Sequence, residues 1–400
     1  MNILFLSELF YPHGGGAELA TFLYAKLLNE KGFNVTVVTN KFQGEEDVQK
    51  DGRLLVYRVE LFRKTIGVKF ATWKRIDVLF SGFVKRLLKS TDIVYVPRTW
   101  FSAIPAAKAY GKPVIAHLHD YAPICPLAVL YNVSRHDICK SRHFCSANCV
   151  YRFEKGKGSS SVNSFLSVPL NLLGRWPIRL CVGLADAIVC VSSAQRQILT
   201  QAVPEIGHKA RVVYNPLPDL PIIKMEGDDF AFLGGTNMLK GFGVLRKASS
   251  LDGGSSKIHV LDATDVDDRV KDFYDPSGLV FHGRLRYDDQ EEFYRRIRSV
   301  VFPSIVPEPL PYVTAEAIMR GRILVASRIG GIPEQVEGCK GAFLCEPGNP
   351  FELVRAIRQV RSLKREVTID MGYQNREVFV RRFNNERTIK DFTEIVDALN

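Results

Sequence analysis

Two carboxylates eight residues apart, Glu308 and Glu316, lie in the most informative stretch of the chain, residues 303–334. Pro311 is well placed to open a helix whose first turns include Glu316. A carboxylate pair can bind or catalyse, but its spacing alone proves little. With 21 glutamates in 400 residues, chance predicts about one such pair. Glu386 and Glu394 have the same spacing and no expected function. The sequence around the pair therefore decides its meaning.

Two glycine-rich turns are candidates for anion binding. Gly14, Gly15 and Gly16 follow the first apolar run and precede an apolar pattern of helical period. Glycines there let backbone amides approach an anion at a positive helix N-terminus, although a plain strand-to-helix turn explains them about as well.

A second turn, Gly234 and Gly235, leads to Lys240. Lys240 could be a point charge for a diphosphate, and the alternative is an exposed loop lysine.

Four cysteines, Cys125, Cys139, Cys145 and Cys149, form the densest group of potential metal ligands, with His136 and His143 among them. The group lacks the paired C-x2-C spacing of a strong zinc site. A structural zinc and a set of free or packed thiols both remain open. Either arrangement could shape an acceptor site just after His119 and Asp120.

Short β-branched runs alternate with helix-length segments in two series, which predicts two consecutive α/β domains with parallel sheets. We place the domains at 1–214 and 215–375, with helices at 376–400 returning to the first, and the linker at the proline-rich stretch from Asn215. Asn385 is the expected cap of the last helix. The predicted strands are residues 2–6, 34–39, 93–96, 113–117, 187–191 and 211–214, then 229–233, 257–261, 279–282, 300–303, 323–327 and 342–345.

The formal charge of +11 belongs to one part of the chain. Residues 1–214 hold 28 Lys and Arg against 15 Asp and Glu, whereas residues 215–400 hold 26 against 28. Residues 61–90 mix eight basic side chains with apolar ones, which suits an anionic membrane surface or, as an even alternative, a core-packing helix with a solvated basic face. We see no nucleic-acid motif, no membrane-spanning stretch and no signal peptide, so we expect a cytoplasmic protein peripheral to the inner face of the cell membrane.

The stretch after residue 303 resembles the retaining GT-B glycosyltransferases of family GT4. Their hallmark is a Pro-Ser strand end, Glu-x7-Glu, a small-residue helix and Gly-Gly-x-Pro-Glu. The chain matches in order and spacing at Pro303-Ser304, Glu308, Glu316-Ala317, Gly321 and Gly330-Gly331-Ile332-Pro333-Glu334. Further matches at Gly15-Gly16-Ala17-Glu18, His119-Asp120, Val191-Ser192, Asn215-Pro216 and Lys240-Gly241 extend the resemblance over nearly the whole chain.

The resemblance implies two Rossmann-like domains facing a cleft, with a UDP- or GDP-linked sugar as donor substrate and no metal needed for catalysis. Glu316 would bind the ribose hydroxyls, Glu308 the transferred hexose, and His119 would reach toward that sugar. Lys240 and the backbone at the helix start would stabilise the leaving diphosphate. The implied catalytic residues are Glu308, His119 and Lys240. The implied donor-binding set adds Glu316, Gly234, Gly235, Leu310, Tyr312 and Arg284, and the loop Gly14–Gly16 is expected to bind acceptor or phosphate.

Three departures from the family pattern keep a rival hypothesis open. Gly235 stands where the family commonly has an arginine, and Pro309 and Pro311 replace glycines and offer no N–H. Our main expectation, from the resemblance, is still a hexosyltransferase that acts on a lipid-linked or surface-glycan acceptor. The alternative is a catalytically silent GT-B subunit that binds a glycan or scaffolds a partner enzyme, and a sugar-nucleotide epimerase is a weaker third.

Overall fold

The computed structural model of the protein describes residues 1–61, 76–98, 100–139, 145–261, 278–283 and 289–400. The chain folds into two compact units, one formed by Met1–Leu217 with Asn384–Asn400 and the other by Pro218–Phe383. Helix α14 (Arg365–Arg382) belongs to the second unit and α15 (Asn385–Leu399) to the first. Each unit has its own core, and each is described here by itself.

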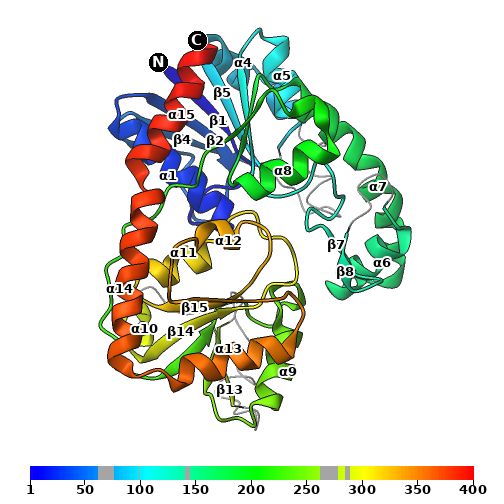
Figure 1. The fold of residues 1–400 in the computed structure, drawn as a ribbon. Helices are drawn as coiled ribbons and strands as arrows, with labels where there is room; N and C mark the ends of the chain where they lie inside the picture. The colour runs from blue at the N-terminus through cyan, green and yellow to red at the C-terminus, as the bar shows by residue number, and fades with distance from the viewer. Residues whose placement is uncertain (62–75, 99, 140–144, 262–277, 284–288) are drawn as a thin grey trace. The chain divides into compact units, whose positions relative to one another are not determined.

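The first unit is built on an eight-stranded sheet of order β10-β9-β6-β5-β1-β2-β4-β3, parallel except for β3 against β4 (Figure 1). The order reverses at β1, where Ile3 lies opposite Val35 of β2 on one side and opposite Ile93 of β5 on the other. The strands are β1 (Asn2–Leu6), β2 (Asn34–Asn40), β3 (Val48–Asp51), β4 (Leu54–Val59), β5 (Ile93–Pro97), β6 (Val114–Leu118), β9 (Ala187–Cys190) and β10 (Ala210–Val212).

Helices cover both faces of this sheet. One core cluster contains side chains from α1 (Gly16–Glu30) and α15, and Phe392 of α15 packs on Tyr24 and Tyr95. The last helix thus returns to the first unit, as the expected fold has it, but the return begins at Asn384 and not at the predicted residue 376. The other face carries α4 (Gly82–Ser90), α5 (Ala103–Ala109), α7 (Ser161–Leu184) and α8 (Ser193–Ala202), with α6 (Ala147–Gly156) packed on α7. A short ribbon, β7 (Tyr131–Asn132) with β8 (Asp137–Ile138), follows β6.

The second unit contains a six-stranded parallel sheet of order β13-β12-β11-β14-β15-β16. This is the strand order of a doubly wound nucleotide-binding fold, whose order reverses between its first and fourth strands, here β11 and β14. The strands are β11 (Asp229–Phe232), β12 (Ile258–Leu261), β13 (Leu279–His282), β14 (Ile297–Phe302), β15 (Ile323–Ser327) and β16 (Ala342–Cys345). The helices are α9 (Phe242–Leu251), α10 (Gln290–Arg296), α11 (Tyr312–Met319), α12 (Ile332–Gln335), α13 (Pro350–Ser362) and α14.

All twelve predicted strands are confirmed, with ends shifted by up to three residues. The predicted cap of the last helix is wrong by one residue. Asn384 caps α15 by accepting from the Arg387 amide at 2.9 Å. Asn385 instead holds the backbone of Leu217 with two hydrogen bonds of 2.7 and 2.9 Å. The second asparagine therefore ties the chain crossover to the start of the last helix.

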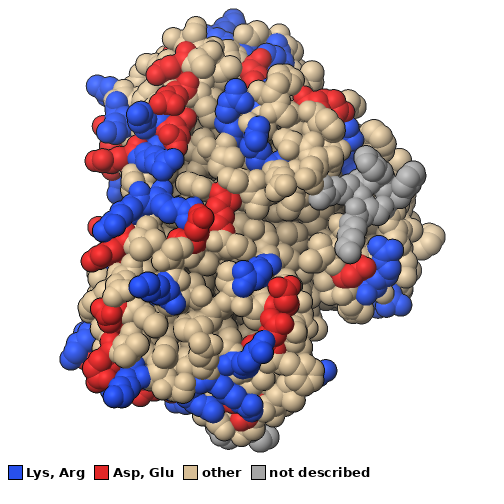
Figure 2. Space-filling model, in the orientation of Figure 1, with Lys and Arg blue, Asp and Glu red and all other residues tan. Residues whose placement is uncertain are grey.

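Charged side chains of both signs lie on the surface. On the face shown in Figure 2, basic side chains are interspersed with acidic ones. Among the described residues, no helix is long and apolar enough to cross a membrane.

Candidate active site

The second unit brings Lys240 and Glu308 together from positions 68 residues apart. Lys240 ends a 3-10 turn, Met238–Lys240, after β11, and Glu308 lies in the loop after β14. Its Oε1 accepts from Lys240 Nζ at 2.7 Å and from Ser304 Oγ at 3.3 Å. Both loops leave the carboxyl ends of the two strands between which the sheet order reverses, which is where such sheets bind ligands. The ion pair therefore stands at the expected ligand edge of this sheet.

Two glycines allow these loops to approach each other. A Cβ on Gly241, whose φ is 91°, would lie 1.9 Å from the Pro303 carbonyl oxygen. A Cβ on Gly330, whose φ is 59°, would lie 2.2 Å from the Glu308 carbonyl oxygen. That same oxygen accepts from the Gly331 amide at 2.8 Å. Since real Cβ atoms are never this close to other atoms, both positions require glycine, and together they fix the backbone on either side of the ion pair.

Glu316 has different electrostatic surroundings from Glu308. It lies on α11, and burial raises its pKa against the opposing effect of Arg320, the C-cap residue of that helix. The neighbouring Tyr294 is buried, and its hydroxyl has no hydrogen-bond partner among the described residues. One carboxylate is thus paired with a lysine, while the other lies in a drier site beside an arginine and a phenol.

The remaining predicted donor residues lie around the same loops. Pro311 is the N-cap of α11, with Leu310 buried before it and Tyr312 opening the helix, whose first N–H groups lack intrahelical partners. Gly234 is packed against the Phe232 ring and Lys240 Cβ. Gly235 donates its N–H to the Leu261 carbonyl at 2.8 Å, so this amide is already used. The prediction for Arg284 falls outside the described residues.

In the first unit, an arginine lies among three carboxyl groups at the carboxyl edge of the sheet. Arg98 follows β5 with a left-handed φ of 63°, which is uncommon for a residue with a side chain. Its guanidinium pairs with Glu18 and lies 3.9 Å from Asp120 Oδ2. Glu8, which follows β1, is buried, and burial together with the charges of Glu18 and Asp120 raises its pKa to about 8 in spite of Arg98. Sequence reasoning did not select Arg98 or Glu8 as site residues.

The glycine run at the start of α1 is filled by a side chain of the same helix. Glu18 Oε2 accepts from the amide of Gly15, the N-cap residue, at 2.7 Å, which is the half of a capping box that a glycine cap allows. A Cβ on Gly14, whose φ is 98°, would lie 2.5 Å from the Glu18 side chain. The Glu18 carboxylate thus takes the hydrogen bond that the loop was predicted to give to a bound anion. Binding of acceptor or phosphate by this loop stays a prediction.

His119 is held as a neutral imidazole. Burial and the charge of Arg98 lower its pKa to about 3, and its ring stacks on His117 with centroids 4.2 Å apart. His117 is in turn fixed by Tyr95, whose hydroxyl lies 2.6 Å from Nδ1. Nε2 of His119 is buried and lacks a hydrogen-bond partner within the part of the chain that the structure describes. The unused nitrogen of a neutral ring can donate a hydrogen bond to a hydroxyl group or accept one from it, depending on the tautomer.

Residues 14–219 match the family model described as Glycosyltransferase Family 4, and residues 252–362 match the model Glycosyl transferases group 1. The first match alone covers more than half of the chain. The chain belongs to glycosyltransferase family 4. The expected family and enzyme class are therefore confirmed.

Relatives of this glycosyltransferase align over most of its length. It is 24% identical over 357 residues to an uncharacterised 42.6 kDa protein in the cps region of Klebsiella pneumoniae, covering 84% of this chain and 87% of the relative. It is 23% identical over 306 residues to an uncharacterised glycosyltransferase of Methanocaldococcus jannaschii, covering 72% of this chain and 84% of the relative.

Solved structures share its fold. A sucrose-phosphate synthase from Thermosynechococcus elongatus superposes with a TM-score of 0.75 at 14% identity, covering 100% of this chain and 98% of the other. Anabaena HepE in complex with UDP superposes with a TM-score of 0.65 at 18% identity, with both chains fully covered. Together with the two parallel sheets, these likenesses confirm the predicted GT-B fold.

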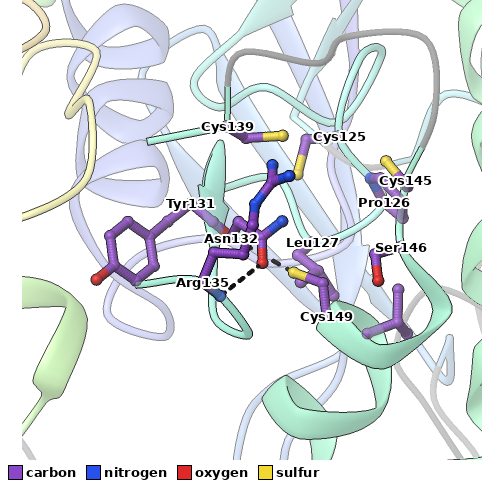
Figure 3. A pocket seen from close by; sticks show the side chains of 11 residues that line it. Cys125, Pro126, Leu127, Tyr131, Asn132, Arg135, Cys139, Cys145, Ser146 and Cys149 are labelled. Atoms are coloured by element: carbon purple, nitrogen blue, oxygen red, sulfur yellow. Dashed lines mark hydrogen bonds between the residues drawn. The ribbon is translucent and has the colours of Figure 1, made fainter. Parts of the chain in front are cut away.

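The four clustered cysteines of the glycosyltransferase line one cavity of about 310 Å³, shown in Figure 3. Burial and the like charge of Cys125, Cys139 and Cys149 raise the pKa of Cys145 to about 11, against the effect of Arg175, whose Nη1 lies 3.7 Å from Sγ. Among the described residues, no group of three or more His, Cys, Asp or Glu is arranged to hold a metal ion. His143, one of the candidate ligands, lies outside the described residues, so the choice between zinc and free or packed thiols stays a prediction.

The basic segment 61–90 is described outside residues 62–75. In that part the apolar side chains Leu79, Val84 and Leu88 are buried in the core. Lys85, Arg86 and Lys89 are exposed. The described part thus matches the alternative of a core-packing helix with a solvated basic face, and membrane contact through this segment stays a prediction.

Proposed function

We propose that this glycosyltransferase moves a hexose from a nucleotide diphosphate sugar to a lipid-linked or surface-glycan acceptor at the inner face of the cell membrane, with retention of anomeric configuration. The observation that carries the proposal is the Lys240–Glu308 pair at the ligand edge of the second sheet, with Glu316 on the helix that follows. A relative in a cps region and the solved structure of Anabaena HepE in complex with UDP-glucose, which has the same fold, support it.

The proposed roles follow from the charges. The ammonium of Lys240 is paired with the carboxylate of Glu308. A bound diphosphate would compete for the ammonium, and this would leave Glu308 available to accept hydrogen bonds from the hexose hydroxyls. The N-terminal amides of α11 add partial positive charge near the departing phosphate, so no divalent metal is needed.

Glu316 would accept from the ribose hydroxyls in its ionised form. Because its pKa is raised, protonation at low pH should weaken donor binding before it affects an ordinary glutamate. His119 would contribute a neutral hydrogen-bonding group toward the sugar. In the bond-breaking step the sugar–phosphate bond cleaves, the acceptor oxygen attacks the same face, and its proton passes to an oxygen of the leaving diphosphate.

The test is release of nucleotide from a panel of UDP and GDP sugars, with and without membrane extract as acceptor. We expect Lys240→Ala, Glu308→Ala and Glu316→Ala each to lower turnover by about a hundredfold or more, because each removes a group that contacts the donor. Lys224→Ala, which changes a lysine exposed over 77% of its side chain in the same unit, is the control and should be unchanged. Circular dichroism checks folding, and full activity of Lys240→Ala would refute its role.

The catalytically silent subunit remains a second candidate. The occupied Gly235 amide and the two prolines, which offer no N–H, favour it. Calorimetry with UDP, GDP and their sugars discriminates between the two candidates. Binding of any of these nucleotides supports the transferase, and absence of binding to all of them supports the silent subunit.

A further inference from the structure

The helix α7 exposes a continuous apolar stripe along its whole length. Eight of its large apolar side chains are between 41% and 72% exposed, which is unusual for so many neighbours on one element. They are Val162, Phe165, Leu166, Leu170, Leu173, Trp176, Leu180 and Leu184. In Figure 1 the helix is the long one that lies beside α6 in the first unit.

Helical geometry puts all eight side chains on one face. At about 100° per residue they fall within an arc of about 140°, and 24 residues make the stripe about 36 Å long. The other positions inside that arc are Pro169, Pro177 and Gly183. No charged side chain interrupts the stripe, and the polar group within it is the indole N–H of Trp176.

The opposite face of α7 holds the helix to the rest of the unit. Ile178, Cys181 and Val182 are buried in the core, and Ser164 is buried with its hydroxyl donating to the Ser160 carbonyl at 2.9 Å. The unit therefore packs one side of α7, and the exposed stripe contributes nothing to that core. A second apolar face on a helix that is already anchored indicates a surface for something outside the chain.

Basic side chains flank the stripe at both ends. Between residues 155 and 185 there is no aspartate or glutamate. Lys155 Nζ donates to Ser161 Oγ at the start of α7, and Lys209 Nζ donates to the Gly183 carbonyl at its end. Lys157, also exposed near the start, lies 3.5 Å from Glu154 Oε1, and Arg179 on the helix pairs with Glu205.

We propose that α7 lies in the headgroup layer of an anionic membrane, with the stripe facing the acyl chains and the flanking lysines on lipid phosphates. An apolar face with cationic ends and an exposed tryptophan is the pattern of a helix that lies in the membrane interface. A symmetric contact between two copies through α7 fits less well, because it would bring the same cations together with no carboxylate from residues 155–185. The inference rests on the proposed function in one respect only: that function supplies the reason for membrane binding, a lipid-linked acceptor.

The experiment is flotation of the full chain with vesicles of phosphatidylcholine alone or with 30% phosphatidylglycerol. We expect binding to the anionic vesicles, and the double variant Leu173→Glu with Leu180→Glu should weaken it roughly tenfold or more. The matched control is Phe351→Glu, because Phe351 is 63% exposed in the second unit and should not matter. Lys155→Gln with Lys157→Gln should weaken binding to anionic vesicles by at least about fivefold.

A second measurement needs no disruptive variant. Vesicles with brominated acyl chains should quench the fluorescence of Trp176 in the wild-type protein, and Trp176→Phe should lose that quenching. Equal flotation of wild type and the double glutamate variant, or no quenching, would overturn the proposal. So would a dimer in sedimentation that the double variant dissociates.

The outcome is separable from that of the transferase proposal. UDP or GDP binding by calorimetry, without vesicles, should be the same in wild type and in the α7 variants. A protein that floats but binds no nucleotide would refute the proposed function and keep the membrane surface. A protein that binds nucleotide but never floats would refute the membrane surface and keep the nucleotide-sugar transferase.

Discussion

Single residues in this glycosyltransferase are tuned by burial as much as by charge. Arg98 lowers the pKa of both Glu8 and His119, but burial opposes it at Glu8 and acts with it at His119. Burial outweighs its attraction for Glu8, whose pKa rises to about 8, while burial and its repulsion together keep His119 neutral. The edge of the first sheet thus presents neutral hydrogen-bonding groups at neutral pH, together with one paired arginine.

The glutamate at position 8 should make the first unit lose stability as pH rises. Its folded pKa of about 8 lies above the unfolded value of 4.5, so the folded state keeps a proton that the unfolded state releases. The contribution is fully present below about pH 4.5 and is lost as pH rises toward 8. We expect Glu8→Gln to remove this loss and to raise the free energy of unfolding at pH 8 by about 2–4 kcal/mol.

Urea unfolding of both proteins between pH 4.5 and 8 measures the effect, because titrations shared by the two proteins cancel in the difference. The exposed glutamate variant Glu60→Gln is the control and should follow wild type. A difference between Glu8→Gln and wild type that stays constant across this range would show that Glu8 does not titrate there.

At the scale of elements, strands with continuous apolar runs could be predicted, but contacts between segments could not. β4 was missed although Asp51-Gly52 marks the turn of its antiparallel pairing with β3. The helix α7 was missed because its serines, asparagines and two prolines oppose helix formation, which its packing on α5 and α6 overcomes. Arg98 gathers partners from three other segments, and no local pattern encodes that meeting.

In the candidate donor site, too, the residues could be predicted and their contacts could not. Lys240, Glu308 and Glu316 could be proposed from the motif and the strands they follow. The ion pair between the first two, and the use of the Gly235 amide by Leu261, depend on loop geometry that spacing does not reveal.

The turn at Gly330 should not tolerate a side chain. In Gly330→Ala the new Cβ would meet the Glu308 carbonyl oxygen, so the loop that carries Glu308 must move. We expect turnover to fall by about tenfold or more and the free energy of unfolding to fall by about 1–3 kcal/mol. Nucleotide release and urea unfolding measure the two effects.

Gly348→Ala is the matched control in the same unit. Its φ is 77°, so alanine has a similar backbone strain, but no heavy atom lies within 4 Å of the added Cβ. It should cost about 1 kcal/mol and leave turnover unchanged. Equal turnover in the two variants would mean that the Gly330 contact does not position Glu308.

At the scale of the whole molecule, the last fifteen residues of helix belong to the core of a unit that begins at Met1. Phe392 of α15 is fully buried against Tyr24 and Tyr95, with ring centroids 5.0 and 5.5 Å away. Phe392→Ala should therefore lower the free energy of unfolding of the first unit by about 3–5 kcal/mol through the cavity it leaves. Calorimetry should show the transition of this unit at lower temperature, while a nucleotide that binds the second unit raises the other transition as in wild type. Phe351→Ala, at an exposed site, should shift neither by more than about 0.5 kcal/mol. An unchanged first transition in Phe392→Ala would show that α15 is dispensable to the core it joins.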